Sequence, residues 1–342
     1  MRVRFKPTHG QRSALRAQLV RLANPDAALR ILAPCLPVAY RSARGTCTLA
    51  SAHADRFVLR VDVRSEAGKG DGEGEGGART YALKVYADDF GHAVWTHAQA
   101  LAAHLRPADD GLVLPLRYVP AERMLVFPWV AGTFLSAIVD ERKPGLLRRA
   151  ARLAARLHRL PIAPEPPTSV DVLLADTRAR CERLARSWPR RSVLVAPLLE
   201  GLEDAAARLD PADPALVHGD MAAGQFVWTG ERLVLLDLDM FGYTDSAYDA
   251  GHFLAQLERR CLWDQSLPEH ACRLLATFRD AYLTAMPEVS PRNVAFYQAL
   301  TLVRKIYTVC RKQPPDDATL VPRLAERAGA ALEDAVGAGQ RG

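Results

Sequence analysis

The chain has 342 residues, of which 49% are hydrophobic and 25% are charged, so it has the balance of an ordinary globular protein and enough sequence for one large domain or two lobes. Its net charge of +6 comes from 45 Lys and Arg against 39 Asp and Glu, but the arginines are scattered rather than gathered with aromatic residues, so we expect no nucleic-acid partner. No segment approaches the ~20 apolar residues of a membrane span, and the N-terminus lacks the apolar run of a signal peptide. Six cysteines without a CxxC motif suit a reducing compartment. We therefore expect a cytoplasmic protein with no membrane contact, and the sequence leaves its oligomeric state open.

The first third of the chain changes from a helical to a β pattern. Leu, Val and Ala recur at helical spacing over residues 11–31, which predicts an N-terminal helical extension, residues 1–30. Apolar and polar residues then alternate over Arg56–Val63 and Thr80–Tyr86, which predicts two strands.

A Gly-rich segment, residues 64–79, joins these two strands. Gly72, Gly74 and Gly77 satisfy the GxGxxG spacing of a phosphate-binding loop, but such a loop requires a helix N-terminus directly after it. Here a strand follows, and the acidic side chains between the glycines would repel phosphate. We interpret the segment as a flexible hairpin loop without a phosphate site.

The rest of the chain divides into a β-rich and a helical part. After the first strands we expect a helix at 91–106, strands at 112–119 and 123–130, and a hinge at 127–132. In the part that follows, residues 133–335, helices are expected at 146–160, 169–188, 194–208, 246–262, 268–285, 291–311 and 318–335, before a short tail at 336–342. The predicted fold is α+β with two lobes, a small β-rich N-lobe of residues 31–126 and a larger helical C-lobe.

The stretch 215–251 carries the strongest functional signal. The tripeptide His218-Gly219-Asp220 precedes two short apolar runs, Phe226–Trp228 and Leu233–Leu236. A four-residue polar link that contains Gly230 joins these runs, as in a β-hairpin.

Pairing Trp228 with Leu233 places Gln225 opposite Leu236. Gln225 and Asp237 then meet at the open end of the hairpin, close to Asp220. A carboxylate that can act as a base, an amide oxygen and a second carboxylate are the groups that phosphoryl transfer from Mg-ATP requires. Asp239 would share the side of Asp237 if the strand continued, and we rank it below Asp237 as a metal ligand.

This segment resembles the catalytic segment of the aminoglycoside/choline kinase-like phosphotransferases, which are relatives of the protein kinases. Their pattern is HGD, four residues, Asn, and an apolar strand that ends in Asp; HGDMAAGQ matches it, except that Gln225 stands where the family usually has Asn. The resemblance implies a protein-kinase-like fold in which Asp220 is the catalytic base and Gln225 and Asp237 bind Mg²⁺. It also implies that Asp249 braces the catalytic loop.

The resemblance also indicates residues that bind the nucleotide. Lys84, in TYALKVY, matches the strand lysine that contacts the α- and β-phosphates. In the hinge sequence LVFPWVAG, with Phe127 as the gatekeeper, the Pro128 carbonyl and the Val130 N–H are expected to bind adenine. Proline lacks an N–H donor but keeps its carbonyl, so Pro128 is compatible with this role.

The sequence therefore predicts an ATP- and Mg²⁺-dependent phosphotransferase that moves the γ-phosphate to a hydroxyl of a small molecule, such as a sugar, an amino alcohol or an antibiotic. Residues 90–108 contain no acid to hold Lys84, and His97 or Gln99 occupies its place. This departure and Gln225 leave open a catalytically weak nucleotide-binding pseudokinase or regulator. A protein kinase is disfavoured because HGD replaces HRD and no DFG or APE motif follows it.

The helices before the catalytic segment carry arginines that bear on the acceptor. Unless these side chains face solvent, they favour a neutral or anionic hydroxyl compound over a cationic one. They are Arg178, Arg180, Arg183, Arg186, Arg190 and Arg191.

Overall fold

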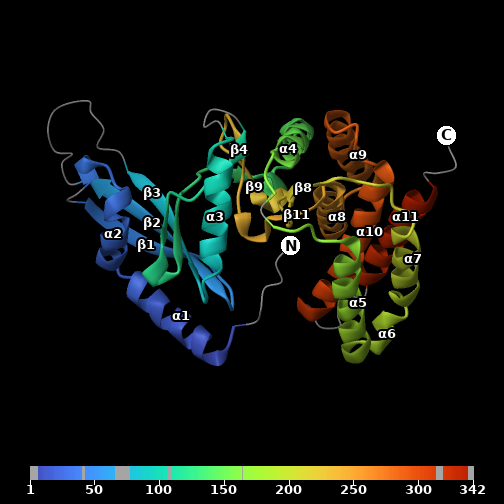
Figure 1. The fold of residues 1–342 in the computed structure, drawn as a ribbon, viewed down its shortest axis with the longest axis horizontal. Helices are drawn as coiled ribbons and strands as arrows, with labels where there is room; N and C mark the ends of the chain where they lie inside the picture. Colours follow the sequence, from blue (N-terminus) through green and yellow to red (C-terminus); the bar gives the residue numbers. More distant parts are fainter. Residues whose placement is uncertain are drawn as a thin grey trace. The chain divides into compact units, whose positions relative to one another are not determined.

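The computed structural model describes residues 7–40, 43–65, 78–105, 110–163, 165–312 and 319–337. The chain forms two compact units, whose elements are labelled in Figure 1. The smaller unit comprises residues 3–107 and 112–131, and the larger one residues 1–2, 108–111 and 132–342.

The smaller unit is built on a five-stranded antiparallel sheet. Its strands are β1 Ala43–Ala52, β2 Arg56–Ser65, β3 Arg79–Tyr86, β5 Arg117–Val119 and β6 Met124–Pro128, in the order β1-β2-β3-β6-β5. Every second side chain of β2 is buried, as the alternation of the sequence predicted. Both strands expected in this region, at 56–63 and 80–86, are confirmed. The flexible loop expected between them falls on residues 66–77, which lie outside the described residues.

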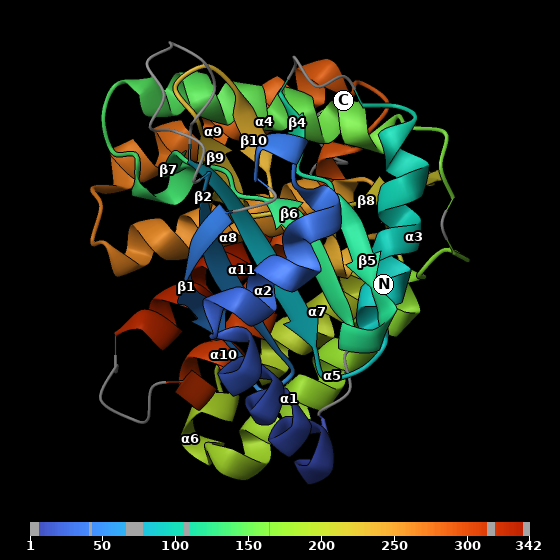
Figure 2. The same cartoon turned by 90° about the vertical axis from the view of Figure 1, so that its left-hand side faces the viewer.

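Two N-terminal helices pack on one face of this sheet (Figure 2). They are α1 His9–Leu22 and α2 Pro25–Leu32, and their apolar side chains share one buried core with alternate residues of β2 and β3. The expectation of continuous helical spacing over 11–31 is wrong in one respect, because the helix is divided at Asn24-Pro25. The Asn24 side chain accepts a hydrogen bond from the Asp26 amide (2.9 Å), and Pro25 is the first residue of the new helix.

The strand expected at 112–119 is also divided. Its residues form β4 Gly111–Leu112 and β5, and Pro115 lies between them. Proline cannot donate to a strand ladder, so a continuous strand through this position is disfavoured. The helix expected at 91–106 is present as α3 Phe90–Ala102, which packs against β3, β5 and β6.

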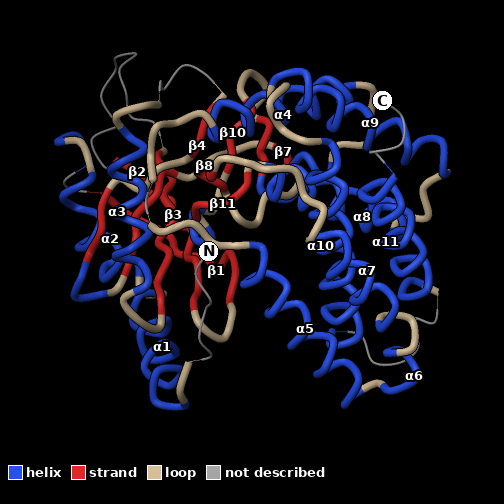
Figure 3. The backbone as a smooth tube through the Cα atoms, turned by 45° about the vertical axis from the view of Figure 1, so that its right-hand side comes forward, coloured by secondary structure: helices blue, strands red, loops and turns tan. Residues whose placement is uncertain are grey.

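The larger unit consists mainly of helices, shown in blue in Figure 3. They are α4 Arg142–His158, α5 Val170–Ser187, α6 Pro189–Ser192, α7 Ala196–Ala206, α8 Ala247–Trp263, α9 Pro268–Ala285, α10 Pro291–Lys312 and α11 Leu320–Gly337. Every helix that the periodicity predicted here is present, and the short α6 is additional. Within the described ranges, no helix is long and apolar enough to cross a membrane.

Short strands and 3₁₀ turns make up most of the first part of the segment 215–251, and a further short strand from outside the segment pairs with them. The strands are β7 Thr133–Phe134, β8 Pro214–Val217, β9 Phe226–Trp228, β10 Leu233–Leu235 and β11 Gly242–Asp245. They form one sheet of order β4-β10-β9-β7 and a separate pair, β11-β8. The turns η5 Ala223–Gln225 and η6 Leu238–Met240 flank the β9–β10 hairpin.

Helix α8 is held in the centre of the larger unit by close packing on both sides. A Cβ at Gly251 would lie 2.5 Å from the Gln298 amide nitrogen of α10, so only glycine allows this approach of the two helices. On another side, the rings of Phe253 and Phe278 of α9 stack with centroids 3.9 Å apart. The side chains of α8 and α10 that reach the catalytic loop are positioned by this packing.

Candidate active site

The tripeptide His218-Gly219-Asp220 follows β8 directly and forms a tight loop. Gly219 has a φ of +80°, and a Cβ at this position would lie 2.0 Å from the Met240 carbonyl oxygen. The left-handed backbone and the close approach of turn η6 both exclude a side chain here. The glycine of the motif is therefore required by the geometry of the loop.

Asp249, on the first turn of α8, is fully buried and holds this loop through both carboxylate oxygens. Its Oδ2 accepts from the His218 amide (2.6 Å), and its Oδ1 accepts from the Gly219 amide (2.9 Å). His158 Nε2 lies 3.1 Å from Oδ2, and His158 Nδ1 lies 2.8 Å from the Tyr282 hydroxyl. Burial opposes ionisation of Asp249, but the hydrogen bond to His158 and the nearby His218 keep its pKa below the ordinary value. This is the bracing geometry expected of Asp249.

His218 links the catalytic loop to the end of strand β10. Its Nε2 donates to the Leu236 carbonyl (2.9 Å), and its Nδ1 accepts from the Asp220 amide (3.4 Å). These two bonds assign the neutral tautomer with the proton on Nε2. The ring is buried and packs edge-on against Phe241, with centroids 5.7 Å apart. One imidazole thus connects the backbone of Asp220 to the residue that precedes Asp237.

The Asp220 side chain is 45% exposed and is hydrogen bonded on one side. Its Oδ1 lies 3.1 Å from His252 Nε2, and His252 Nδ1 lies 3.4 Å from the Thr301 hydroxyl. Burial lowers the pKa of His252, so its neutral ring donates to Asp220. Burial opposes ionisation of Asp220 as well, but the hydrogen bond from His252 and the charge of Lys305 keep its pKa below the ordinary value. Asp220 is therefore an ionised carboxylate that a ligand can reach.

The β9–β10 hairpin has the register that the sequence predicted. Leu233 pairs with Trp228, and the Leu236 amide donates to the Gln225 carbonyl oxygen (2.8 Å). The backbone of Gln225 therefore lies beside Leu236, one residue before Asp237.

Asp237 has a left-handed backbone, with φ 66° and ψ 84°. This conformation costs a residue other than glycine about 1 kcal/mol or more and persists only where the surroundings impose it. The strand does not continue past it, so the condition under which Asp239 would share the side of Asp237 is not met. Instead η6 begins, the Asp239 amide donates to Asp237 Oδ1 (3.2 Å), and Asp239 is buried.

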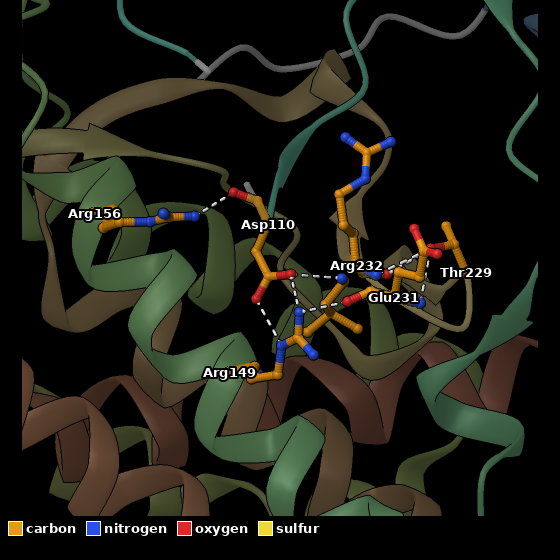
Figure 4. Close-up of polar contacts among 7 residues, drawn as sticks. Asp110, Arg149, Arg156, Thr229, Glu231 and Arg232 are labelled. Carbon is orange, nitrogen blue, oxygen red and sulfur yellow. Dashed lines mark hydrogen bonds and ion pairs between the residues drawn. The ribbon is translucent and has the colours of Figure 1, made fainter. Parts of the chain in front are cut away.

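A charged pair attaches this hairpin to helix α4 (Figure 4). Arg149 donates through Nε and Nη2 to the Asp110 carboxylate (2.8 and 2.5 Å), and Asp110 Oδ1 also accepts from the Leu233 amide (2.7 Å). Arg149 Nη2 donates to the Glu231 carbonyl in the turn (3.0 Å; Figure 4). Its guanidinium lies 4.6 Å from the centre of the Trp228 ring. Both strands of the hairpin and the turn between them are therefore held by Arg149 together with Asp110.

The oxygen ligands expected at the end of the hairpin suit Mg²⁺ better than a metal whose ligands all come from the protein. In the described part of the chain, no group of three or more His, Cys, Asp or Glu could hold a metal. Asp237 and Gln225 offer one carboxylate and one amide oxygen. Mg²⁺ is usually bound by one or two side chains together with waters and substrate phosphates, whereas structural Zn²⁺ requires four protein ligands.

Lys84 lies in the smaller unit, in the middle of the sheet. It is 8% exposed, and its Nζ lies 5.6 Å from the centre of the Tyr86 ring. Its neighbour Leu83 belongs to the core beneath α1 and α2, so Lys84 faces the other side of the sheet. Of the two residues expected at the position of the missing acid, His97 on α3 is buried and Gln99 is exposed.

The expected hinge begins at the end of β6. Pro128 pairs with Tyr81, and the next amide, that of Trp129, donates to the Thr80 carbonyl (3.0 Å). This bond fixes the backbone between Pro128 and Val130, the two residues expected to bind adenine.

The model of the phosphotransferase enzyme family named APH matches residues 73–292, which is well over half of the chain. The chain belongs to this phosphotransferase family. None of the curated proteins searched matches it significantly.

Solved structures of kinases resemble this phosphotransferase along most of their length. A choline/ethanolamine kinase family protein from Mesorhizobium loti has a TM-score of 0.56 and 18% identity, over 96% of this chain and 99% of that one. A thermostable mutant of aminoglycoside phosphotransferase APH(4)-Ia, in a ternary complex with ADP and hygromycin B, has a TM-score of 0.61 and 14% identity, over 91% and 98%. Choline kinase LicA from Streptococcus pneumoniae has a TM-score of 0.55 and 13% identity, over 90% and 98%. These likenesses confirm the predicted α+β, protein-kinase-like fold.

Several side chains around Asp220 of this phosphotransferase were not singled out in the sequence. His252 follows Asp249 by three positions, so both lie on one face of α8, and this spacing could have indicated it. Thr301 and Lys305 are far along the chain and reach Asp220 only because α10 packs on α8. Of the six arginines that bear on the acceptor, Arg180 lines the cavity at Asp220.

Proposed function

We propose that this phosphotransferase transfers the γ-phosphoryl group of ATP to a hydroxyl of a small molecule, with Asp220 as the catalytic base. The observation that carries the proposal is that the buried ring of His218 is hydrogen bonded to both the Asp220 amide and the carbonyl of Leu236, beside Asp237. Membership of the phosphotransferase family supports phosphoryl transfer, and the relative in complex with ADP supports a nucleotide donor.

In the proposed reaction, the acceptor hydroxyl attacks the γ-phosphorus. An oxygen–phosphorus bond forms, the bond from the γ-phosphorus to the β,γ-bridging oxygen breaks, and ADP leaves with its electron pair while the hydroxyl proton moves to Asp220. His252 occupies Oδ1 of Asp220, whereas Oδ2 has no hydrogen-bond partner within the described residues. Because the hydroxyl loses its proton late in a loose transition state, a carboxylate with a lowered pKa is sufficient as the base.

We assign the metal, the phosphates and adenine to separate groups of residues. Mg²⁺ bound by Asp237 and Gln225 would offset negative charge on the phosphates. Lys84 would contact the α- and β-phosphates, and the Pro128 carbonyl and Val130 N–H would bind adenine. Relatives named as acting on choline, or bound to hygromycin B, support a small-molecule acceptor, and a sugar, an amino alcohol or an antibiotic would satisfy this proposal.

The test is ADP formation from Mg-ATP with a panel of sugars, amino alcohols, hydroxy acids and antibiotics, with Asp220→Asn as the control. We expect at least one class to be turned over. Removal of the base should lower kcat by about 10²–10⁴-fold and leave the Kd of Mg-ATP nearly unchanged. An Asp220→Asn protein that keeps most of its activity, or a wild type that binds no Mg-ATP by calorimetry, would refute the proposal.

A second function is favoured by one observation. Helix α3 has no acidic residue, and of His97 and Gln99, the two residues expected in place of the acid that holds Lys84, His97 is buried. A nucleotide-binding regulator with weak catalysis would have this composition. It would bind Mg-ATP and show the associated rise in melting temperature, but form no ADP with any acceptor.

A further inference from the structure

A cavity of about 200 Å³ lies beside Asp220 in the larger unit. Its walls come from helix α5, the catalytic loop, turn η6 and helices α8 and α10. Sites for drug-sized ligands usually measure about 300–1,000 Å³, so this cavity suits a smaller molecule. Because Asp220 is one of its walls, a molecule bound here would lie next to the proposed base.

The charged side chains of this cavity are mainly cationic. Arg180 of α5 and Arg304 and Lys305 of α10 line it, whereas Asp220 is the only acidic residue among the described residues that do so. Asp176, which does not line the cavity, accepts from Arg180 Nε (2.9 Å) and also from Arg304. If Asp176 is counted together with Asp220, two carboxylates balance two of the three cations. One positive charge remains without a counter-charge.

Among the described residues, Lys305 is a cavity cation without a direct partner. Its ammonium group makes no hydrogen bond or ion pair within the described ranges of the chain. Burial lowers the pKa of Lys305 to about 8, since the attraction of Asp220 is opposed by Arg259, Arg304 and Arg180. A desolvated charge without a counter-ion is costly, and an anionic ligand would offset that cost.

We propose that this cavity binds the carboxylate or phosphate group of the acceptor, so that the enzyme phosphorylates a hydroxyl of a small anionic molecule. This inference rests on the proposed function, because it takes Asp220 as the base. A cationic acceptor would meet like charge from Arg180, Arg304 and Lys305. The alternative use of these cations, to hold the phosphates of ATP, is an outcome of the tests below.

The first test compares acceptors of similar size and different charge. Glycerate and glycerophosphate are anionic, glycerol is neutral and serinol is cationic. At pH 7 we expect kcat/KM for at least one anionic member to exceed that for glycerol about tenfold or more, and serinol to be the poorest acceptor. Preferential turnover of serinol, choline or an aminoglycoside would overturn the inference.

The second test measures anion binding without turnover. Inorganic sulfate should raise the melting temperature of the wild-type protein at low millimolar concentration, relative to chloride at equal ionic strength. Lys305→Gln should lose most of this rise, whereas Lys312→Gln, on the exposed side of the same helix, should keep it. Concentrated sulfate stabilises most proteins. The test is therefore the difference between the two variants in the sulfate-induced rise of the melting temperature. Lys305→Met replaces Lys305→Gln if the latter does not fold.

The sulfate effect should also depend on pH. Sulfate keeps its charge between pH 7 and pH 9, whereas Lys305 loses its proton through a pKa of about 8. The sulfate-induced rise should therefore be larger at pH 7 than at pH 9 in the wild type, and independent of pH in Lys305→Gln. Arg180, Arg259 and Arg304 stay charged and Asp220 stays ionised over this range.

The outcomes separate this inference from the proposed function. Equal responses to sulfate in the wild type and Lys305→Gln would refute anion binding at this cavity. A Lys305→Gln variant with a higher KM for ATP and an unchanged KM for the acceptor would assign the cations to the nucleotide. Turnover of cationic acceptors alone would leave the proposed function standing and remove this inference. Absence of Mg-ATP binding would remove the proposed function itself.

Discussion

Asp220 combines two properties that a catalytic carboxylate needs. The hydrogen bond from His252 and the charge of Lys305 keep its pKa below the ordinary value of 3.8, so Asp220 remains ionised throughout the neutral range. The stabilisation that these contacts give is present above pH 3.8 and is lost as the pH falls through the lowered pKa. Its free oxygen is open to a ligand, because the side chain is 45% exposed. Acid inactivation near pH 5 would therefore have to come from another group.

Substitution of Gln225 tests whether its amide oxygen binds the metal directly. If its amide oxygen binds Mg²⁺ directly, Gln225→Asn retracts that oxygen by about one C–C bond, which octahedral Mg²⁺ tolerates poorly. We expect the Mg²⁺ concentration for half-maximal ADP formation to rise several-fold, with partial rescue by the larger Mn²⁺. Asp237→Asn, which removes the charged ligand, should weaken Mg-ATP binding more.

Superimposable Mg²⁺ titrations of Gln225→Asn and the wild type would exclude direct ligation. A fall in melting temperature without a change in the Mg²⁺ titration would instead show that the Gln225 side chain only supports the loop.

The β9–β10 hairpin shows what a local sequence pattern can and cannot predict. The length of the link and the two apolar runs determine the register, so the pairing of Leu233 with Trp228 was predictable. The attachment of this hairpin to α4 was not, because Asp110 and Arg149 lie far from it and from each other in sequence. Likewise, the amphipathic helices were predictable from their periodicity, whereas the breaks at Asn24-Pro25 and Pro115 depend on single residues within otherwise regular patterns.

Arg149→Met should loosen the hairpin, and Arg148→Met is the matched control on an exposed face of the same helix. Loss of the bonds to Asp110 and to the Glu231 carbonyl leaves a partly buried carboxylate without its cation. We expect about 1–3 kcal/mol lower free energy of unfolding, and a weaker Mg-ATP complex because Gln225 and Asp237 stand at the end of this hairpin. Arg148→Met should change stability by less than about 0.5 kcal/mol.

Denaturant unfolding of the two variants measures the difference. Equal free energies of unfolding for Arg149→Met and Arg148→Met would show that the pair contributes nothing. A destabilised Arg149→Met with unchanged Mg-ATP affinity would separate the stability of the hairpin from the nucleotide site.

At the scale of the whole chain, the fold was predictable and the cavity beside Asp220 was not. A β-rich part followed by a helical part is a pattern that survives at 14–18% identity to the relatives, because it depends on the placement of apolar residues rather than on their identity. The cavity at Asp220 combines residues of α5, α8 and α10 that lie between positions 180 and 308 of the sequence. Their convergence follows from helix packing. The sequence indicated Arg180 only as one of six arginines and gave no sign of Lys305.

Among the residues expected to bind ATP, Lys84 is the one whose loss separates nucleotide binding from the chemistry at Asp220. Lys84→Met should raise the Kd of Mg-ATP about tenfold or more, because a charge-assisted contact to phosphate is removed. Saturating ligand at 100 times Kd stabilises a folded protein by about 2.7 kcal/mol, and a tenfold weaker complex loses about half of that. The rise in melting temperature with Mg-ATP should shrink accordingly, whereas Lys312→Met should respond like the wild type. Calorimetric titration of the same proteins gives the Kd directly, and an unchanged Kd for Lys84→Met would exclude Lys84 from the nucleotide site.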